Sequence, residues 1–210
     1  ANSFSSNGLG GIYVISGGNI IESNTINNNG FKWWNGNGIL LEQGDDNVVT
    51  NNTIYSNAVD GIMVSYSWWN KDPSDRNTIT NNTVHDNRAG IFVYASDWNM
   101  VWNNTAYNNY SCGIQVTSAG TAIIAEHNTI YSNTATGNGW GYPPPGDEFG
   151  VDLYWDSVGD VWTGSAWQGL TNNHWGTWGG LNGNIYGTWA IAVPWKPGFG
   201  FGYAPGPFPI

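Results

Sequence analysis

Acidic residues cluster at three places where neighbouring carboxylates could perform acid–base chemistry. The clusters are Glu42 with Asp45 and Asp46, Asp72 with Asp75, and Asp147 with Glu148 and Asp152. Enzymes that cleave glycosidic bonds use two carboxyl groups, one as proton donor and one as base or nucleophile. No predicted strand presents a column of aspartates across adjacent coils, which a shared acid–base site would need. Glu22 and Glu126 occupy one repeat position, but four coils separate them.

Basic residues are too few to complete a lyase site. A lyase that acts on an acidic sugar needs a basic residue for the substrate carboxylate or for the abstracted proton. The chain has five basic residues, which are Lys32, Lys71, Arg76, Arg88 and Lys196. Only Lys71 and Arg76 adjoin an acidic cluster, around Asp72, and we interpret this segment as a local salt-bridged turn. We therefore expect no catalytic residues and no enzyme activity.

The histidines lack the spacing of metal ligands, and we expect no cofactor. His127 and His174 have no ligating residue at the required spacing. His85 falls in a mostly aromatic column, predicted to be an outer ladder of Asn27, Tyr55, His85, Tyr107 and Tyr131. The oxygen-rich segment 42–46 could hold calcium, which prefers carboxylate and carbonyl ligands, or could be a solvated turn.

Two loops carry paired tryptophans, Trp33 with Trp34 and Trp68 with Trp69. Their rings could stack on sugars, as aromatic platforms do. Tryptophan also concentrates binding energy at protein–protein contacts. A third interpretation is that these rings pack the loops against the body of the molecule. The sequence leaves the three interpretations open.

A repeated phrase determines the elements that must position these residues. It reads roughly N-T-I-x-x-N, and its first asparagine is Asn24, Asn52, Asn82, Asn104 and Asn128 in five copies. Five residues earlier stand Asn19, Asn47, Asn77 and Asn99, with Ile123 in the fifth copy. A repeat of roughly 22 to 30 residues is too short to bury its own core, which indicates a solenoid of stacked coils.

Alternating apolar and polar residues predict short strands whose alternate side chains point inward. One inward column is Ile26, Ile54, Val84, Ala106 and Ile130. The strands that begin with glycine and isoleucine give two more inward columns. The first column is Ile12, Ile39, Ile62, Ile91, Ile114 and Val151. The second column, two residues further along each strand, is Val14, Leu41, Val64, Val93, Val116 and Leu153. Because no segment has helical periodicity, we predict an all-β protein.

These repeats resemble the right-handed parallel β-helix superfamily, which includes pectate lyases, other carbohydrate-active proteins and NosD-like surface proteins. The resemblance covers residues 1–155 and implies a β-solenoid of about six coils. It places an inner asparagine ladder at Asn24, Asn52, Asn82, Asn104 and Asn128. Residues 156–210 are rich in tryptophan, glycine and proline, and we expect them to cap the solenoid or to link it to a neighbouring subunit.

Composition excludes one class of partner and indicates a location. The 210 residues include 15 acidic and 5 basic ones, and a formal net charge of -10 argues against binding to nucleic acid. No apolar run approaches the length of a membrane span. A low fraction of charged residues (10%) and four N-glycosylation motifs, at Asn51, Asn81, Asn103 and Asn109, predict a secreted or cell-surface protein. Asparagine-rich repeats also form such motifs by chance.

The outer face of the glycine–isoleucine strands carries an apolar stripe. One outward residue lies between the two inward ones of each strand, which gives Tyr13, Leu40, Met63 and Phe92, followed by Gln115 and Asp152. Either the chain's own tail or another subunit is expected to cover this stripe. The first residues are in register with the middle of a coil, so Asn2 and Phe4 are expected at an open solenoid end.

We therefore predict an extracellular structural protein that assembles into a filament, sheath or surface layer. The expected assembly residues are Asn2, Phe4, Tyr13, Leu40, Met63, Phe92, Trp189, Trp195, Phe199 and Phe201. The alternative is a carbohydrate-binding or polysaccharide-degrading β-helix module that uses the tryptophan loops. The expected partner is another copy of the chain, or a glycan in the alternative.

Overall fold

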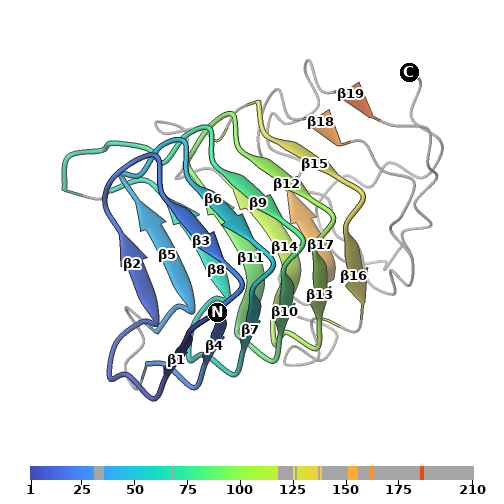
Figure 1. Ribbon diagram of the computed structural model, residues 1–210. Coiled ribbons are helices and arrows are strands. Elements are labelled where there is room, and N and C mark those ends of the chain that lie inside the picture. Colours follow the sequence, from blue (N-terminus) through green and yellow to red (C-terminus); the bar gives the residue numbers. More distant parts are fainter. Residues whose placement is uncertain are drawn as a thin grey trace.

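The computed structural model describes residues 1–30, 36–67, 69–117, 127–136 and 151–155, together with Ala125, Asn138, residues 161–162 and residues 185–186. These residues form three parallel β-sheets, A, B and C, stacked coil on coil around one core (Figure 1). From β1 to β18 the chain passes from sheet A to sheet B to sheet C, so each coil adds one strand to each sheet. No helix occurs among the described residues. The predicted all-β parallel solenoid is therefore confirmed.

The strands are short and follow one another in a fixed order. Sheet A contains β1 (Ser3–Ser5), β4 (Thr25–Asn27), β7 (Thr53–Tyr55), β10 (Thr83–His85), β13 (Thr105–Tyr107) and β16 (Thr134–Thr136). Sheet B contains β2 (Ile12–Val14), β5 (Ile39–Glu42), β8 (Ile62–Ser65), β11 (Ala89–Tyr94), β14 (Cys112–Thr117) and β17 (Val151–Trp155). Sheet C contains β3 (Ile20–Glu22), β6 (Val48–Thr50), β9 (Thr78–Thr80), β12 (Met100–Trp102), β15 (Thr129–Tyr131), β18 (Val161–Trp162) and β19 (Ile185–Tyr186).

The number of coils differs slightly from the six expected. Residues 1–117 complete about four turns, and the later strands continue the same three sheets. Two strands lie within the region predicted to cap or link the solenoid, because β18 pairs with β15 and β19 pairs with β18. The remainder of residues 156–210 lies outside the described residues.

The core consists of the inward residues of all three sheets. In sheet A, Ile26, Ile54 and Val84 occupy one register position on successive coils and are completely buried. Burying each such side chain contributes about 1.5–3 kcal/mol to folding. The strand residues on either side point outward, as the period of two requires. Each coil therefore buries its apolar residues only by stacking on its neighbours.

Asparagines at the three corners form hydrogen-bonded ladders. The ladders consist of Asn2, Asn24, Asn52, Asn82, Asn104 and Asn133; of Asn7, Asn29, Asn57, Asn87, Asn109 and Asn138; and of Asn19, Asn47, Asn77, Asn99 and Asn128. In a typical step, the backbone N–H and the side-chain amide of Asn52 both donate to Oδ1 of Asn82, each at 3.0 Å. These bonds satisfy the backbone and the side chains of tight turns that are closed to water.

The structure corrects the predicted ladder at its fifth copy. Oδ1 of Asn128 accepts a hydrogen bond from the backbone of Asn99 at 3.0 Å, so Asn128 belongs to the corner between sheets B and C. The ladder through Asn104 continues instead at Asn133, because the backbone N–H of Asn104 donates to Oδ1 of Asn133 at 2.9 Å. In this coil β15 and β16 both begin with a threonine that follows an asparagine, Asn128 or Asn133, and this similarity hides a shift by one strand in the sequence.

The same shift moves two further predicted columns. Ile130 and Tyr131 lie in sheet C, paired with β12, rather than in sheet A. Sheet A is continued by Ala135 and Thr136, which pair with β13. The inward column of sheet A therefore ends in an alanine, and the predicted outer ladder does not include Tyr131.

Close approach between coils explains the glycine that precedes most strands of sheet B. A Cβ atom on Gly38 would lie 2.4 Å from Cγ2 of Ile54 and 2.6 Å from the carbonyl oxygen of Gly61. No side chain fits this position without moving the next coil.

Candidate functional site

The outer face of sheet B carries a row of large side chains, one from each coil, which we call the outer row. Pairing of the strands places side by side Tyr13, Leu40, Met63, Phe92 and Gln115. Tyr13 is 60% exposed, the next three are partly buried and Gln115 is buried. The stripe that the sequence indicates is thus a feature of this face, whereas its role in assembly stays a prediction.

The end of the outer row differs from the prediction. Strand β17 is displaced by two residues, so Leu153 rather than Val151 pairs with Ile114. Tyr154 rather than Asp152 is consequently the residue in register with Gln115. The acidic residue that ended the predicted column therefore does not pair with it.

A second row with polar groups runs beside the outer row. It comprises Glu42, Ser65, Tyr94 and Thr117. The hydroxyl of Tyr13 donates a hydrogen bond to Oε2 of Glu42 in the next coil, at 2.5 Å. Desolvation and this hydrogen bond raise the pKa of Tyr13 to about 12. The ring of Tyr94 lies 5.4 Å from that of Phe92, centre to centre, so the two rows are in contact.

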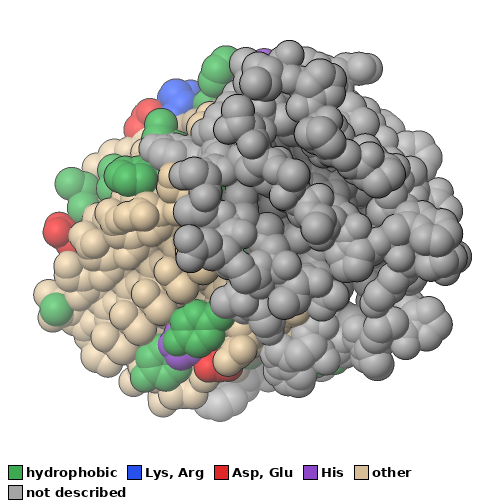
Figure 2. All heavy atoms as spheres, turned by 90° about the vertical axis from the view of Figure 1, so that its right-hand side faces the viewer, with side chains coloured by type: hydrophobic (Ala, Val, Ile, Leu, Met, Phe, Trp, Pro, Cys, Tyr) green, Lys and Arg blue, Asp and Glu red, His purple; other side chains and the backbone are tan. Residues whose placement is uncertain are grey.

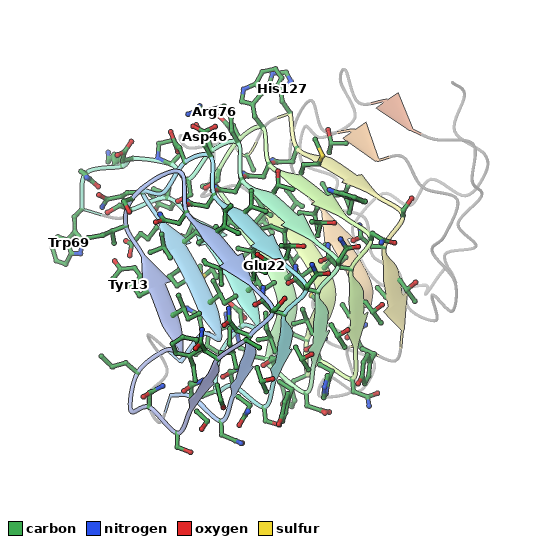
Figure 3. The ribbon with its side chains drawn as sticks, in the orientation of Figure 1. Tyr13, Glu22, Asp46, Trp69, Arg76 and His127 are labelled. Carbon is green, nitrogen blue, oxygen red and sulfur yellow. The ribbon has the colours of Figure 1, made fainter. Side chains whose placement is uncertain are left out.

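The loop between β8 and β9 borders this face and carries Trp69. Its base is closed by Ser74, whose hydroxyl donates to the carbonyl oxygen of Ser65 at 2.8 Å. Trp69 is 96% exposed and lies at the same side of the molecule as Tyr13 (Figure 3). Of the four tryptophans predicted to contact glycans, Trp33, Trp34 and Trp68 lie outside the described residues.

A buried ion pair lies at the corner where the chain enters sheet B. The carboxylate of Asp60 is completely buried and accepts hydrogen bonds from Nε and Nη2 of Arg88, at 3.2 and 3.1 Å. Burial raises the pKa of Asp60, while the guanidinium opposes this shift. The backbone N–H of Asp60 donates to Oδ1 of Asn37 at 3.0 Å, which joins three coils at this corner.

Aspartates from three successive coils stack at the opposite corner, between sheets B and C. The backbone N–H of Asp75 donates to Oδ1 of Asp45 at 2.8 Å, and that of Asp97 donates to Oδ1 of Asp75 at 2.7 Å. Burial and the adjacent Asp45 raise the pKa of Asp75, although the Asp97 N–H and Arg76 oppose the shift. This column lies at a corner outside the strands, so it does not contradict the prediction that no strand presents a column of aspartates, but it was not predicted from the sequence.

Arg76 pairs with this acidic corner rather than with its own loop. Its Nη2 lies 2.8 Å from Oδ2 of Asp45, and its Nε lies 3.0 Å from Oδ1 of Asp46. The predicted local salt-bridged turn around Asp72 is corrected accordingly, because the partners of Arg76 belong to the preceding coil. Asp46, Arg76 and His127 lie along one edge of the solenoid (Figure 3).

Sheet A presents an aromatic ladder on its outer face. The ring of His85 stacks on Tyr55 and on Tyr107, with centroid distances of 5.1 and 4.6 Å. Nδ1 of His85 lies 2.7 Å from Oδ2 of Asp86. These positions agree with the prediction that His85 belongs to an outer ladder.

His127 is the remaining histidine in the described part of the chain, and its ring stacks on that of Trp98 with a centroid distance of 4.2 Å. The described residues contain no group of histidine, cysteine and acidic side chains that could hold a metal ion. Calcium binding by segment 42–46 stays a prediction.

Three of the four glycosylation motifs lie at exposed corners. Asn51, Asn81 and Asn103 are exposed and have positive φ. Asn109 is instead completely buried, and its amide donates to Asn138 at 2.8 Å. It cannot carry a glycan in the folded protein, which corrects that part of the prediction.

The residues predicted for assembly do not form one described surface. Phe4 packs against the core, and the backbone of Asn2 donates to Oδ1 of Asn24 at 3.1 Å. The four tail residues Trp189, Trp195, Phe199 and Phe201 lie outside the described residues.

The fold and its ladders agree with sequence comparison. The chain belongs to the family of proteins with a right-handed β-helix region, whose profile matches residues 1–139. Comparison with curated proteins gives no match. Among the described residues, no helix has the length and apolarity of a membrane span.

Two solved structures share this fold. The A-module of mannuronan C-5 epimerase AlgE4 from Azotobacter vinelandii is 15% identical, with a TM-score of 0.57 over 88% of this chain and 52% of that one. The periplasmic alginate epimerase AlgG is 16% identical, with a TM-score of 0.52 over 87% of this chain and 43% of that one. The chain thus spans about half the length of each.

These comparisons overturn one expectation and weaken another. The expectation that the chain is not an enzyme is contradicted, because the solved structures that it resembles are epimerases. They favour the alternative of a carbohydrate-acting module and give no support to a filament. AlgG is periplasmic, which accords with a location outside the cytoplasm, although the secreted location of this chain stays a prediction.

Proposed function

We propose that the chain acts on a polysaccharide, which it holds along the outer face of sheet B. The observation that carries the proposal is the pairing of an apolar, aromatic outer row with a second row of hydroxyl and carboxylate groups. A sugar ring has the same two characters, since its face consists of C–H groups and its rim of hydroxyls. Aromatic and apolar side chains pack against the face, and Glu42 and Tyr94, the partly exposed members of the second row, hydrogen-bond the rim.

The repeat of the fold suits a polymer better than a single sugar. Coils follow one another at about 4.8 Å, so successive sugars of an extended chain can contact the outer row on successive coils. Tyr13, Leu40, Met63 and Phe92 provide successive contacts along the solenoid axis. Trp69 adds an exposed ring at the border of the face.

Tyr13 and Glu42 are the groups of this face best placed to exchange a proton with a bound glycan. With a pKa of about 12, the phenol of Tyr13 stays protonated near neutral pH and can only donate. The carboxylate of Glu42 can accept a proton, which gives a donor and an acceptor side by side. Both structural neighbours are epimerases of polysaccharides, which supports the assignment of chemistry to this fold.

Affinity electrophoresis of the full chain tests the proposal. In gels that contain a soluble glucan, mannan or polyuronate, we expect at least one polysaccharide to retard the protein. Phe92→Ala and Trp69→Ala should each weaken the apparent affinity by roughly tenfold, as aromatic anchors do. Tyr107→Ala is the matched control, because Tyr107 is an aromatic residue on the outer face of sheet A, away from the proposed binding face. Absence of retardation in every gel, or an equal loss with Tyr107→Ala, overturns the proposal.

A further inference from the structure

Charges around the outer face of sheet B define the class of glycan more narrowly. Resting on the proposed function, we infer that this face selects a neutral polysaccharide and discriminates against polyuronates. The mannuronan and alginate named for the two solved structures belong to the rejected, acidic class. The inference follows from the positions of carboxylates and guanidinium groups in this chain.

A carboxylate lies on the face itself. Glu42 belongs to the second row, and its Oε2 accepts the hydrogen bond from Tyr13 at 2.5 Å. Its remaining lone pairs can accept hydrogen bonds from sugar hydroxyls. The same group repels a uronate carboxylate, since two like charges a few ångströms apart oppose each other even in water.

The corner between sheets B and C adds negative charge along one border of the face. Asp45, Asp46, Asp75 and Asp97 lie there with Arg76, which gives four acidic side chains to one basic and a net charge of -3 when all are ionised. The raised pKa of Asp75, caused by burial and by Asp45 among others, is consistent with this excess. A polyuronate along the face would therefore run beside a negative edge.

At the opposite border, the residues that the structure describes provide no compensating charge. Nε and Nη2 of Arg88 are both engaged by Asp60, so this pair is neutral as a whole. Turning Arg88 toward a ligand would leave the buried carboxylate of Asp60 without its partner, which is strongly unfavourable. Arg88 is thus a structural partner rather than a receptor for sugar carboxylates.

The two rows themselves contain no lysine or arginine among the residues that the structure describes. Recognition of an acidic polymer relies on charge-assisted hydrogen bonds from basic groups. Lys71, in the loop that carries Trp69, directly precedes Asp72 in the chain. Figure 2 views the molecule from the side opposite Tyr13 and Trp69, and lysine and arginine side chains are scarce on the described part of that side too. Neutral hydroxyl-rich sugars meet the hydrogen-bonding needs of the face without this charge conflict.

Calorimetric titration of the full chain with neutral and acidic oligosaccharides of equal length tests the inference. The probes are manno- and gluco-oligosaccharides on one side and oligomannuronates on the other, all with EDTA present so that calcium cannot bridge carboxylates. At low salt we expect a neutral series to bind at least roughly tenfold more tightly, and the difference should narrow as salt screens the repulsion. Tighter binding of the oligomannuronates overturns the inference but leaves the proposed function standing, whereas binding of neither series overturns the proposed function.

Two matched variants locate the charge effect. Glu42→Gln removes one negative charge from the face and should raise the affinity for uronate relative to neutral sugar by about threefold, from the Coulomb energy of unit charges about 6 Å apart in water. Glu22→Gln is the control, because Glu22 is an exposed residue of sheet C (Figure 3). An equal change of the affinity ratio in both variants, or no change in Glu42→Gln, contradicts the role of Glu42.

Discussion

Arg88 and Asp60 form an ion pair in which the guanidinium is 44% exposed and the carboxylate is completely buried. The two residues lie 28 positions apart in the chain and belong to adjacent coils. The pair therefore ties one coil to the next at the corner where the chain enters sheet B. Its energetic asymmetry is large, because only the carboxylate has lost its water.

Arg88→Met should destabilise the protein by about 3–5 kcal/mol at neutral pH, since it leaves a buried charge without a partner. A raised folded-state pKa means that the stability linked to Asp60 is fully present below its unfolded pKa and is lost as pH rises through the folded value. The deficit of the variant should therefore shrink as the pH falls and Asp60 takes up a proton. Denaturant unfolding between pH 4 and 7 measures this.

The double variant Asp60→Asn with Arg88→Met controls for lost packing. It should regain much of the stability at neutral pH, because no buried charge remains. A deficit of Arg88→Met that does not change with pH contradicts the assignment.

Asn52→Ala should cost about 3 kcal/mol of stability, because a buried amide leaves several partners unsatisfied. The side-chain amide of Asn52 donates to the carbonyl oxygens of Ile21 and Thr50, each at 2.9 Å, and its Oδ1 accepts the backbone N–H of Asn24 at 2.9 Å. The adjacent Asn51→Gly is the control, because Asn51 is exposed and its φ of 56° suits glycine. Equal midpoints of thermal unfolding for the two variants would show that the ladder contributes little.

The asparagine repeat predicted the solenoid correctly because every coil needs the same corner chemistry. It could not fix which corner a given asparagine occupies. Asn77 and Asn82 are both followed by threonine and a β-branched residue, although one precedes a strand of sheet C and the other a strand of sheet A. Asn128 fits both patterns, and its ladder is identified by its hydrogen bond with Asn99 and by the pairing of β15 with β12.

Unequal coil lengths hid the acidic corner from sequence analysis. Asp45 and Asp75 are 30 residues apart, whereas Asp75 and Asp97 are 22 apart. The difference arises from the loop that carries Trp69, which leaves the coil and returns to it at Ser74. The Tyr13–Glu42 contact was equally hidden, because it joins neighbouring coils diagonally rather than along one column.

Gly38→Ala should lower the midpoint of thermal unfolding by several degrees or prevent folding. The added Cβ would meet the Gly61 carbonyl oxygen at 2.6 Å, and backbone of the next coil cannot yield cheaply. Gly8→Ala is the control, because no atom lies within 4 Å of the Cβ that it would add. Circular dichroism melting of both variants checks this, and an unchanged midpoint for Gly38→Ala would contradict the stated packing of the coils.

Tyr13 should titrate about two pH units above an ordinary tyrosine, at a pKa of about 12 instead of 10.0. Desolvation and the hydrogen bond to Glu42 favour the neutral phenol, so stability linked to Tyr13 is fully present below pH 10 and is lost as pH rises through about 12. The ultraviolet difference titration between the native chain and Tyr13→Phe isolates this one phenol from the other ten tyrosines. Glu42→Gln removes the charge and replaces the carboxylate with a weaker, neutral acceptor, so it should lower the midpoint toward 10, whereas Glu22→Gln on sheet C should not move it. A Tyr13 midpoint that Glu42→Gln leaves unchanged would mean that the two groups do not interact in solution.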